Sequence, residues 1–393
     1  ATPNHIKSRR INRMGTSTNY PGLAAIALHE MGAVGVAGAE RCTAVLDAQA
    51  PPKPQLQVHT SGTTGAPKHV GFSFDMVAKY IVGQNVSAVA GEQTEATPVL
   101  LTFPLGNISG IYSVLPTMLQ RRRAVLLNRF TLDGWRDFVR RFQPEMPGLP
   151  PGAVGMVLDA GIPPEELACV KMILTGAAPL DPPIQRAFEA RYGIPILLSY
   201  GATEFGGPVT AMTPELYAQF GNTKLGTVGQ PFAGARLRAV DAETGLVLPA
   251  GQEGLLEVSA PRIGEHWIRT TDIGVVDADG FIFLRGRADG AIVRGDFKLL
   301  PEVIERALCL HPAVAAAAVV GVADRRLGQV PAAAVQLKLG VPAPTSAELE
   351  QHLRYHVYAT HIPTKWHFVD ALPRNNSFKI SLPDVKALFV QSA

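Results

Sequence analysis

Residues 60–68 concentrate hydroxyl groups, glycines and a lysine within nine positions. The segment reads TSGTTGAPK and follows a strand-like run at Leu56–His59. Glycines let the backbone approach an anion, hydroxyls donate hydrogen bonds, and Lys68 adds positive charge. A Walker loop requires four residues between its first glycine and Gly-Lys, whereas two separate Gly62 from Gly65. We therefore predict a phosphate-binding loop of another kind, with a flexible polar linker as the alternative.

Three further clusters carry groups suited to a nucleotide. The segment SYGATEFGG (199–207) follows an apolar strand, and the ends of parallel strands are ligand-binding positions. Its Glu204 is suited to hold Mg²⁺ beside phosphate oxygens. Asp272 and Arg287 flank a predicted hairpin with the turn DADG and are suited to ribose hydroxyls. Alone, Glu204 also fits a solvent-facing carboxylate, the Asp272–Arg287 pair a surface ion pair, and Lys379 a surface lysine.

The elements that must position these clusters predict an α/β protein. A largely parallel sheet flanked by helices follows from the alternation of strand-like runs with helical segments such as 182–192. The strand-like runs lie at 99–103, 124–127, 170–174 and 194–199. From about Gly226, short strands broken by Gly, Pro and Asp predict a small antiparallel, barrel-like part. After Arg287, a helix opening at Pro301 and a strand at 313–322 predict a small α+β domain.

The first fifty residues carry weaker signals. A helix is expected around 22–31, and the proline-rich residues 50–54 are expected to form a linker or turn.

Composition excludes several other classes. The chain has 393 residues, 47% of them hydrophobic, and its longest apolar stretch (313–322) is too short to span a bilayer. The net charge is +3 and the basic spots lack flanking aromatics, so no nucleic-acid partner is expected. Three widely spaced cysteines predict neither a disulfide framework nor a zinc site, and with no secretory signal a cytoplasmic location is expected. His352 and His356 have zinc-like spacing, but surface histidines are favoured.

Taken in order, the motifs TSGTTGAPK, YGATE, TTD, GRADG and the late lysine resemble those of the adenylate-forming family. That family comprises acyl- and aryl-CoA synthetases, adenylation domains of peptide synthetases and luciferase-like enzymes. The resemblance runs from about Gln55 to Val385. It implies that ATP and Mg²⁺ activate a carboxylic acid as an acyl-adenylate, with release of pyrophosphate. The acyl group would then pass to the thiol of CoA or of a carrier protein's phosphopantetheine. An amide-forming ligase with an amine acceptor and a non-catalytic nucleotide-binding scaffold stay open.

The resemblance also implies roles for individual residues. The β- and γ-phosphates would be held by Thr60, Ser61, Gly62, Thr63, Thr64, Gly65 and Lys68. The adenine would lie along Gly176, Ala177 and Ala178 and stack on Tyr200, in the same motif as Gly201 and Ala202. Thr203 would contact the α-phosphate, Glu204 would hold the metal, and Asp272 with Arg287 would bind the ribose. Lys379 would bridge the carboxylate and the α-phosphate, which makes Lys379, Thr203, Glu204 and Lys68 the predicted catalytic set.

The acid pocket and the moving parts follow from the same resemblance. The pocket is expected to be lined by Gly106, Asn107, Ile111, Met156, Met172 and Phe205. Its apolar members favour an aryl or apolar acid, although Gly106-Asn107 replaces the family's usual aromatic–histidine pair. Asp289 would be the hinge between a domain at 1–286 and a mobile domain at 287–393. Gly295 and Lys298 would line a pantetheine tunnel.

Two departures from the family pattern stand out. Only 59 residues precede the glycine-rich loop, which predicts a shortened first domain. The late motif reads NNSFK rather than the frequent SGK, so the loop presenting Lys379 lacks its glycine. A homodimer is one open possibility for the assembly.

Overall fold

The computed structural model of the chain falls into two units, Ala1–Pro54 and Gln55–Ala393. It describes residues 25–28, 34–37, 55–60, 68–83, 97–103, 106–120, 122–127, 129–295, 297–375 and 378–390. In the first unit, strand β1 (Ala25–Leu28) pairs antiparallel with β2 (Val34–Ala37). The helix expected around 22–31 is therefore wrong. The helix propensity of its alanines is overridden by pairing with a valine-containing partner strand, a tertiary effect that local propensity does not contain.

The second unit begins with the hairpin of β3 (Gln55–Thr60) and β4 (Lys68–Ser73). Its register pairs Thr60 directly with Lys68. Val58 and Phe72 are buried against Ile108 and Ile111 of helix α2. The other elements of this region are α1 (Phe74–Met76), the π-helix η2 (Val77–Val82), α2 (Ile108–Leu119) and the parallel strands β5 (Val99–Leu101) and β6 (Ala124–Leu126).

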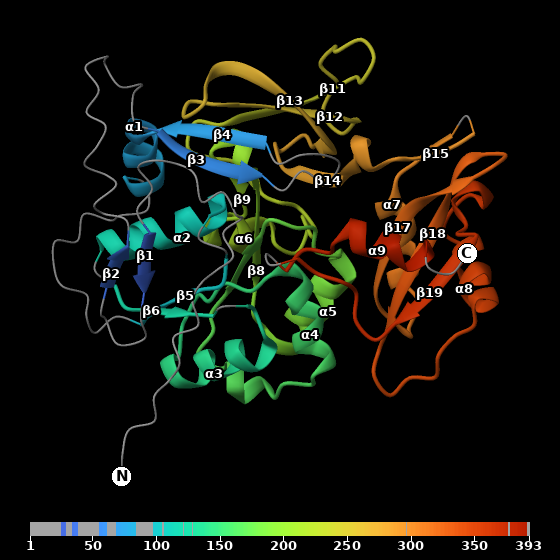
Figure 1. Cartoon of the computed structure of the whole chain (residues 1–393), viewed down its shortest axis with the longest axis horizontal. Helices are drawn as coiled ribbons and strands as arrows, with labels where there is room; N and C mark the ends of the chain where they lie inside the picture. The colour runs from blue at the N-terminus through green and yellow to red at the C-terminus, as the bar shows by residue number, and fades with distance from the viewer. Residues whose placement is uncertain are drawn as a thin grey trace. The chain divides into compact units, whose positions relative to one another are not determined.

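A four-stranded sheet of order β10-β9-β8-β7 lies at the centre of this unit (Figure 1). Strands β7 (Ile173–Gly176) and β8 (Ile196–Ala202) are parallel, as predicted, whereas β9 (Gly207–Ala211) and β10 (Gln230–Pro231) continue the sheet antiparallel. Trp135, Phe138, Val157 and Phe188 are fully or almost fully buried in the core against it. The surrounding helices are α3 (Leu132–Phe142), α4 (Pro151–Asp159), η3 (Pro164–Leu167), α5 (Pro182–Tyr192) and α6 (Pro214–Phe220).

The predicted antiparallel part is a sheet of order β11-β12-β13-β14. Its strands are β11 (Arg236–Val240), β12 (Glu253–Ala260), β13 (Gly264–Val276) and β14 (Ile282–Arg287). The DADG turn closes the last hairpin because the Asp277 carboxylate accepts from the backbone N–H groups of Asp279 and Phe281, at 3.0 and 2.8 Å. Gly280 takes the left-handed conformation, φ +80°, that favours glycine. This turn sets Asp272 opposite Arg287 in the register, as predicted.

The C-terminal elements form an α+β arrangement with its own cores. Strands run in the order β16-β15-β18-β17, and β19 pairs in parallel with β18. Helices α7 and α8 pack on one face of this sheet and α9 on the other. The bounds are β15 (Ile292–Arg294), β16 (Phe297–Leu299), α7 (Pro301–Cys309), β17 (Val314–Asp324), β18 (Gly328–Leu337), α8 (Ser346–Arg354), η6 (Ala359–His361), β19 (Lys365–Val369) and α9 (Leu382–Val390).

Three absences concern only the part of the chain that the structure describes. No helix there combines the length and apolar character needed to cross a membrane. Cys169 and Cys309 are free thiols. No group of three or more histidine, cysteine or acidic side chains in those residues is arranged to hold a metal ion, and His352 Nε2 instead lies 2.9 Å from the carbonyl of Ala307.

Truncating the central core at Trp135 tests how much the main unit depends on it. Trp135 is 0% exposed, and its Nε1 donates to the carbonyl of Gly148 at 3.0 Å. Trp135→Ala leaves a cavity and an unpaired carbonyl, so we expect the free energy of unfolding in urea to fall by about 3–5 kcal/mol. Leu246→Ala, at a side chain that is 69% exposed, should change it by less than about 0.5 kcal/mol. Equal losses in the two variants would contradict this account.

Candidate active site

Two of the predicted motifs, TGAAP and YGATE, lie at the same edge of the central sheet, at the carboxyl ends of β7 and β8. Gly176 ends β7 and pairs with Ser199 of β8. A Cβ on Gly176 would lie 2.5 Å from Ser199 Oγ, so glycine is required for this approach. The next residue, Ala177, is left-handed at φ +67°, which turns the TGAAP segment sharply away from the strand. Ala178 follows it, and Tyr200, Gly201 and Ala202 form the last three positions of β8.

A short 3₁₀ turn, η4 (Thr203–Phe205), follows β8 directly. Its middle residue Glu204 is exposed, whereas Phe205 is only 2% exposed and packs in the main core. The turn ends on Gly206 and Gly207, both left-handed, at φ +70° and +114°. One turn thus exposes a carboxylate and buries its neighbouring ring.

Two residues that sequence reasoning missed hold this turn in place. Arg262 donates from Nε to the carbonyl of Phe205 at 2.6 Å and from Nη2 to the carbonyls of Gly207 (3.2 Å) and Pro208. The Tyr112 hydroxyl donates to the carbonyl of Gly206 at 2.8 Å. Even the contact with the smallest sequence separation joins residues 54 positions apart. Neither side chain belongs to a local motif that would predict its contact.

A hydrogen bond joins the central sheet to the antiparallel sheet inside the site. The Tyr200 hydroxyl donates to Asp272 Oδ2 at 2.5 Å. Burial and the neighbouring Asp272 carboxylate raise the pKa of Tyr200 above its usual value, so the phenol stays protonated and donates. Burial also raises the pKa of Asp272, while the Tyr200 hydrogen bond and the charge of Arg287 oppose that rise.

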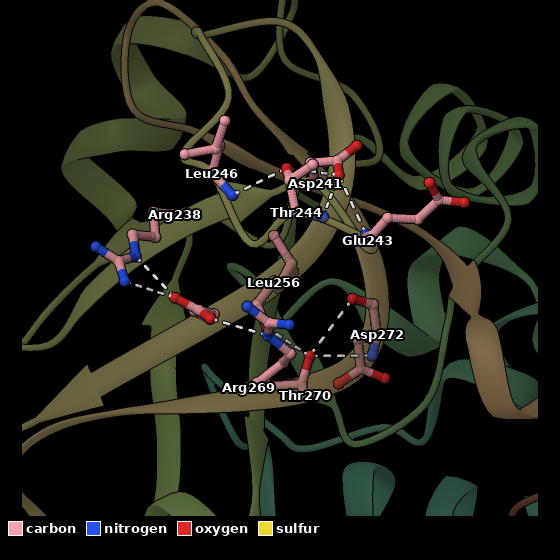
Figure 2. A network of polar contacts seen from close by, with 10 residues as sticks. Arg238, Asp241, Glu243, Thr244, Leu246, Leu256, Arg269, Thr270 and Asp272 are labelled. Atoms are coloured by element: carbon pink, nitrogen blue, oxygen red, sulfur yellow. Dashed lines mark hydrogen bonds and ion pairs between the residues drawn. The ribbon is translucent and has the colours of Figure 1, made fainter.

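The backbone around Asp272 is fixed by Thr270, as Figure 2 shows. The Thr270 hydroxyl accepts from the Asp272 N–H at 3.0 Å and donates to the carbonyl of Leu256 on the neighbouring strand at 2.8 Å. In the same sheet, Arg238 and Arg269 bind the buried Glu257 carboxylate at 2.7 and 3.0 Å. These contacts make β12 and β13 a rigid support for Asp272.

Arg287 lies between Asp272, the carboxylate predicted to bind the ribose, and Asp289, the predicted hinge residue. Its Nε is 3.9 Å from Asp272 Oδ1. Two parallel hydrogen bonds, at 2.9 and 2.7 Å, run from Arg287 to Asp289 in η5 (Ala288–Gly290). Desolvation tends to raise the pKa of Asp289, but the hydrogen bonds and the charge of Arg287 together outweigh it and hold that pKa below its usual value. The Arg287 backbone N–H also donates to Glu302 on α7, at 3.2 Å, a residue the sequence reasoning missed.

Lys379 reaches this cluster from the far end of the chain. Although Lys379 as a whole is exposed, the protein around its ammonium desolvates that group and lowers its pKa. Arg287 lowers the pKa further, and the carboxylates of Asp272 and Glu204 raise it. The predicted late lysine therefore shares its electrostatic surroundings with the turn after β8, with Asp272 inside β13 and with Arg287 at the end of β14. Glu204, Asp272, Arg287 and Lys379, which lie 175 residues apart at the extremes, are brought together.

The predicted phosphate loop connects the two strands of the first hairpin. Thr60 and Lys68 end and begin paired strands, while Ser61, Gly62, Thr63, Thr64 and Gly65 lie outside the described residues. A strand–loop–strand setting also differs from the strand–loop–helix setting of a Walker loop. The exclusion of that class therefore rests on topology as well as on spacing.

The side chains predicted to line the acid pocket pack with different hydrophobic clusters of the structure. Ile111 packs with the first hairpin, Met156 packs against the main core, and Met172 packs with Leu197 and Phe281. Gly106 is exposed. Asn107 is the N-cap of α2, where its Oδ1 accepts from the Gly110 N–H at 2.7 Å. Met156 alone of the set borders a cavity of about 340 Å³, shared with Phe130 and Phe378.

The predicted tunnel residues lie on one β-hairpin of the C-terminal sheet. Lys298 is exposed on β16 and pairs with Val293 of β15. Gly295, at φ +58°, lies at the end of β15 in the left-handed conformation. The two residues are therefore close along one hairpin, as expected from their sequence spacing.

Comparison with known proteins agrees with these motifs. The model of the AMP-binding enzyme family matches residues 32–265, and that of the AMP-binding enzyme C-terminal domain matches residues 303–379. A 4-coumarate–CoA ligase of Oryza sativa subsp. japonica is 30% identical, in a match that covers 89% of this chain and 71% of the ligase. The chain belongs to the AMP-binding, adenylate-forming enzymes, which confirms the predicted family, fold class and enzyme class.

Solved structures of adenylate-forming enzymes resemble this chain in fold. The o-succinylbenzoate CoA synthetase from Bacillus subtilis in complex with its acyl-adenylate intermediate has a TM-score of 0.67 and 26% identity, over 84% of this chain and 68% of that one. The amide bond synthetase from Marinactinospora thermotolerans has a TM-score of 0.68 and 25% identity, over 85% and 69%. The chain thus spans about two thirds of the length of these neighbours.

A matched pair of tyrosine substitutions tests the contact between the two sheets. Tyr200→Phe removes a donor to a carboxylate, whereas Tyr192→Phe removes a donor to the backbone carbonyl of Ile162 (3.0 Å). At neutral pH we expect Tyr200→Phe to lower the free energy of unfolding by about 1.5–3 kcal/mol and Tyr192→Phe by about 1 kcal/mol.

The pH dependence of the two losses should differ. Asp272 has a raised pKa, which Tyr200→Phe raises further because the hydrogen bond to the carboxylate is lost. The loss in Tyr200→Phe is therefore smallest at low pH, where Asp272 is protonated, and grows as pH rises through the two pKa values. The loss in Tyr192→Phe should stay constant, since no titrating group accepts that bond. Urea unfolding between pH 4 and 8 measures both, and parallel curves would contradict the assignment.

Proposed function

We propose that this protein activates an aryl or apolar carboxylic acid with ATP and transfers the acyl group to a thiol. The observation that carries the proposal is the cluster in which Arg287 lies beside Asp272 and Asp289, and in which the charges of Asp272, Glu204 and Arg287 act on Lys379. At this position, a lysine from the C-terminal part of the chain can face both the carboxylate of the substrate and the α-phosphate of ATP, at the carboxyl ends of β7 and β8. The named relatives act on 4-coumarate and o-succinylbenzoate, which supports an aryl acid.

The first reaction joins two anions, so charge neutralisation and positioning dominate its barrier. A carboxylate oxygen of the acid attacks the α-phosphorus, the bond to the β-phosphate breaks, and pyrophosphate leaves with that electron pair. Lys379 would stabilise the charge on the carboxylate and α-phosphate oxygens. Thr203, at the start of the η4 turn, would donate to the α-phosphate. The backbone of residues 60–65 and Lys68 would hold the departing phosphates.

The nucleoside would be fixed by the contact between the two sheets. Asp272 offers carboxylate oxygens to ribose hydroxyls, and Arg287 is held beside it by Asp289 and Thr271. Tyr200 lies at the end of β8, where an adenine would stack above Gly176, Ala177 and Ala178. Mg²⁺, when bound with ATP, would neutralise phosphate charge. The exposed Glu204 carboxylate is a hard oxygen ligand of the kind that Mg²⁺ prefers.

The second reaction would use another position of the C-terminal part. A thiolate would attack the acyl carbonyl and release AMP, with CoA or a carrier protein's phosphopantetheine as the thiol. We assign residues 287–393 to the moving domain, Asp289 to its hinge, and Gly295 and Lys298 to the thiol tunnel. The hinge assignment is supported by the position of Asp289 between β14 and β15, where it pairs with Arg287.

An amine acceptor is the second candidate. The likeness to an amide bond synthetase favours it, because that neighbour has a TM-score as high as the CoA synthetase has. Acyl-AMP consumed by an amine but not by CoA or a phosphopantetheinylated carrier would decide for amide formation.

Replacing Lys379 tests the proposal at its central residue. We expect Lys379→Ala to slow acid-dependent exchange of labelled pyrophosphate into ATP by about a hundredfold or more, because a charge matched to the transition state is lost. Transfer from preformed acyl-AMP to the acceptor should change little, since that step does not need the lysine. Lys386→Ala, at an exposed lysine on α9, is the matched control and should leave both reactions unchanged.

Three outcomes would count against the proposal. Wild-type protein that binds ATP but exchanges pyrophosphate with no aryl, fatty or amino acid would indicate a nucleotide-binding scaffold. An equal loss of both half-reactions in Lys379→Ala would contradict two separate poses. Activity with amino acids only would contradict the aryl or apolar substrate.

A further inference from the structure

Phe378, the residue directly before Lys379, has a backbone conformation that aromatic residues rarely adopt. Its φ is +62°, in the left-handed region that favours glycine. For a residue with a Cβ this conformation is costly, and it persists only where the surroundings impose it. Something other than backbone freedom must therefore hold the lysine loop in this shape.

The Phe378 side chain supplies that restraint by packing against the main body of the protein. Its ring lies 4.9 Å from the ring of Phe130, centroid to centroid, with 58° between the planes. Phe130 is 4% exposed and belongs to the core that contains Trp135 and Phe188. A tilted aromatic pair at this distance is attractive beyond its burial of apolar surface. The ring thus ties the end of the chain to a core built from residues 130–282.

Arg374 adds a second contact to the same ring. Its guanidinium carbon lies 4.7 Å from the centroid of the Phe378 ring, and Nη1 donates to the carbonyl of Phe378 at 3.0 Å. Gly152 at the start of α4 makes room for this guanidinium, since a Cβ there would lie 2.6 Å from Nη1. The side chain and the backbone of Phe378 are therefore both held.

Hydrogen bonds within the lysine loop couple the backbone position of Phe378 to that of Lys379. Arg374 pairs with Ile380 across the turn. Asn375 accepts from the N–H of Phe378 at 2.9 Å through its carbonyl and from the N–H of Lys379 at 3.1 Å through Oδ1. A shift of the Phe378 ring must move the adjacent lysine backbone.

We propose that Phe378 is a positioning residue that holds Lys379 in its adenylating pose through the contacts of its ring with Phe130 and Arg374. The inference rests on the proposed function for the role of Lys379. It implies that packing imposes on this loop the conformation that a glycine would merely permit. It also implies that the Phe130–Phe378 contact must break before the C-terminal part can change pose.

Two substitutions separate the ring from the backbone conformation. Phe378→Gly relieves the positive φ but removes the ring, and Phe378→Tyr keeps the ring. We expect Phe378→Gly to lower kcat for pyrophosphate exchange roughly ten- to a hundredfold, with KM for ATP nearly unchanged, because the lysine is misplaced rather than lost. Phe378→Tyr should retain most of the rate, and transfer from preformed acyl-AMP should be unchanged in both. Phe368→Ala, at a 40% exposed ring on β19, is the control. Phe378→Gly at the wild-type exchange rate would overturn the proposal.

A double-mutant cycle locates the contact. The effects of Phe130→Ala and Phe378→Ala on exchange should be non-additive by roughly three- to tenfold if the two rings act through each other. Strictly additive effects would overturn the contact. Urea unfolding of each variant shows whether the core has survived the loss of Phe130.

Amide hydrogen exchange provides a readout that does not depend on catalysis. In Phe130→Ala, the amides of Phe378 and Lys379 should exchange at least about tenfold faster than in wild type, while Phe368→Ala leaves them unchanged. Unchanged protection in Phe130→Ala would overturn the inference. Faster exchange in a protein that adenylates no acid would uphold the anchor and refute the proposed function instead.

Discussion

The hydrogen bond from Tyr200 to Asp272 is the contact on which the site depends. Tyr200 ends a strand of the central sheet and Asp272 lies on the antiparallel sheet, and the two oxygens are 2.5 Å apart. Because both groups are largely withdrawn from water, the bond is stronger than a surface contact and costly to leave unmade. Asp272 in turn faces Arg287, which is bonded to Asp289 and, through its backbone, to Glu302 on α7. One polar chain therefore links both sheets of the main body to the C-terminal elements.

The charges of this cluster nearly balance before any ligand is present. Among the described residues, Arg287 and Lys379 face the carboxylates of Asp272, Glu204 and Asp289. The three carboxylates outnumber the two cations, so no positive charge is left over for a triphosphate. In the proposed reaction, backbone N–H groups, Lys68 and Mg²⁺ must therefore supply most of the neutralisation. This gives Lys379 a narrow task, which is to act at the α-phosphate rather than along the whole phosphate chain.

Local signals in the sequence predicted much of the fold. The helix predicted at 182–192 is found at Pro182–Tyr192, and the DADG turn sets Asp272 opposite Arg287 because its hydrogen bonds are confined to a few residues. The ends of the parallel strands β7 and β8 lie two to three residues beyond those predicted, since packing rather than propensity decides where a buried strand stops.

Contacts between distant segments carry no comparable signal. Arg262 and Tyr112 meet the η4 turn from far along the chain, and neither lies in a recognisable motif. The family motif predicts a pocket position for Asn107, and it carries no sign that the Asn107 side chain also caps α2. Phe378 could be noticed only as a missing glycine, because its partner Phe130 lies 248 positions earlier in the chain.

The turn after Glu204 has an evolutionary consequence. Any Cβ on Gly207 would overlap the Tyr112 ring, and a Cβ on Gly206 would overlap the end of Met76. Arg262 binds three of the turn's carbonyls at once, a fork that a lysine cannot reproduce. These contacts join four separate segments. The Tyr112 ring and the Arg262 fork restrict changes in the turn, whereas the flexible end of Met76 can move aside. Lineages that alter the ring or the fork should alter the turn as well, so the turn is expected to be inherited as a block of covarying positions while the surface helices around it drift freely.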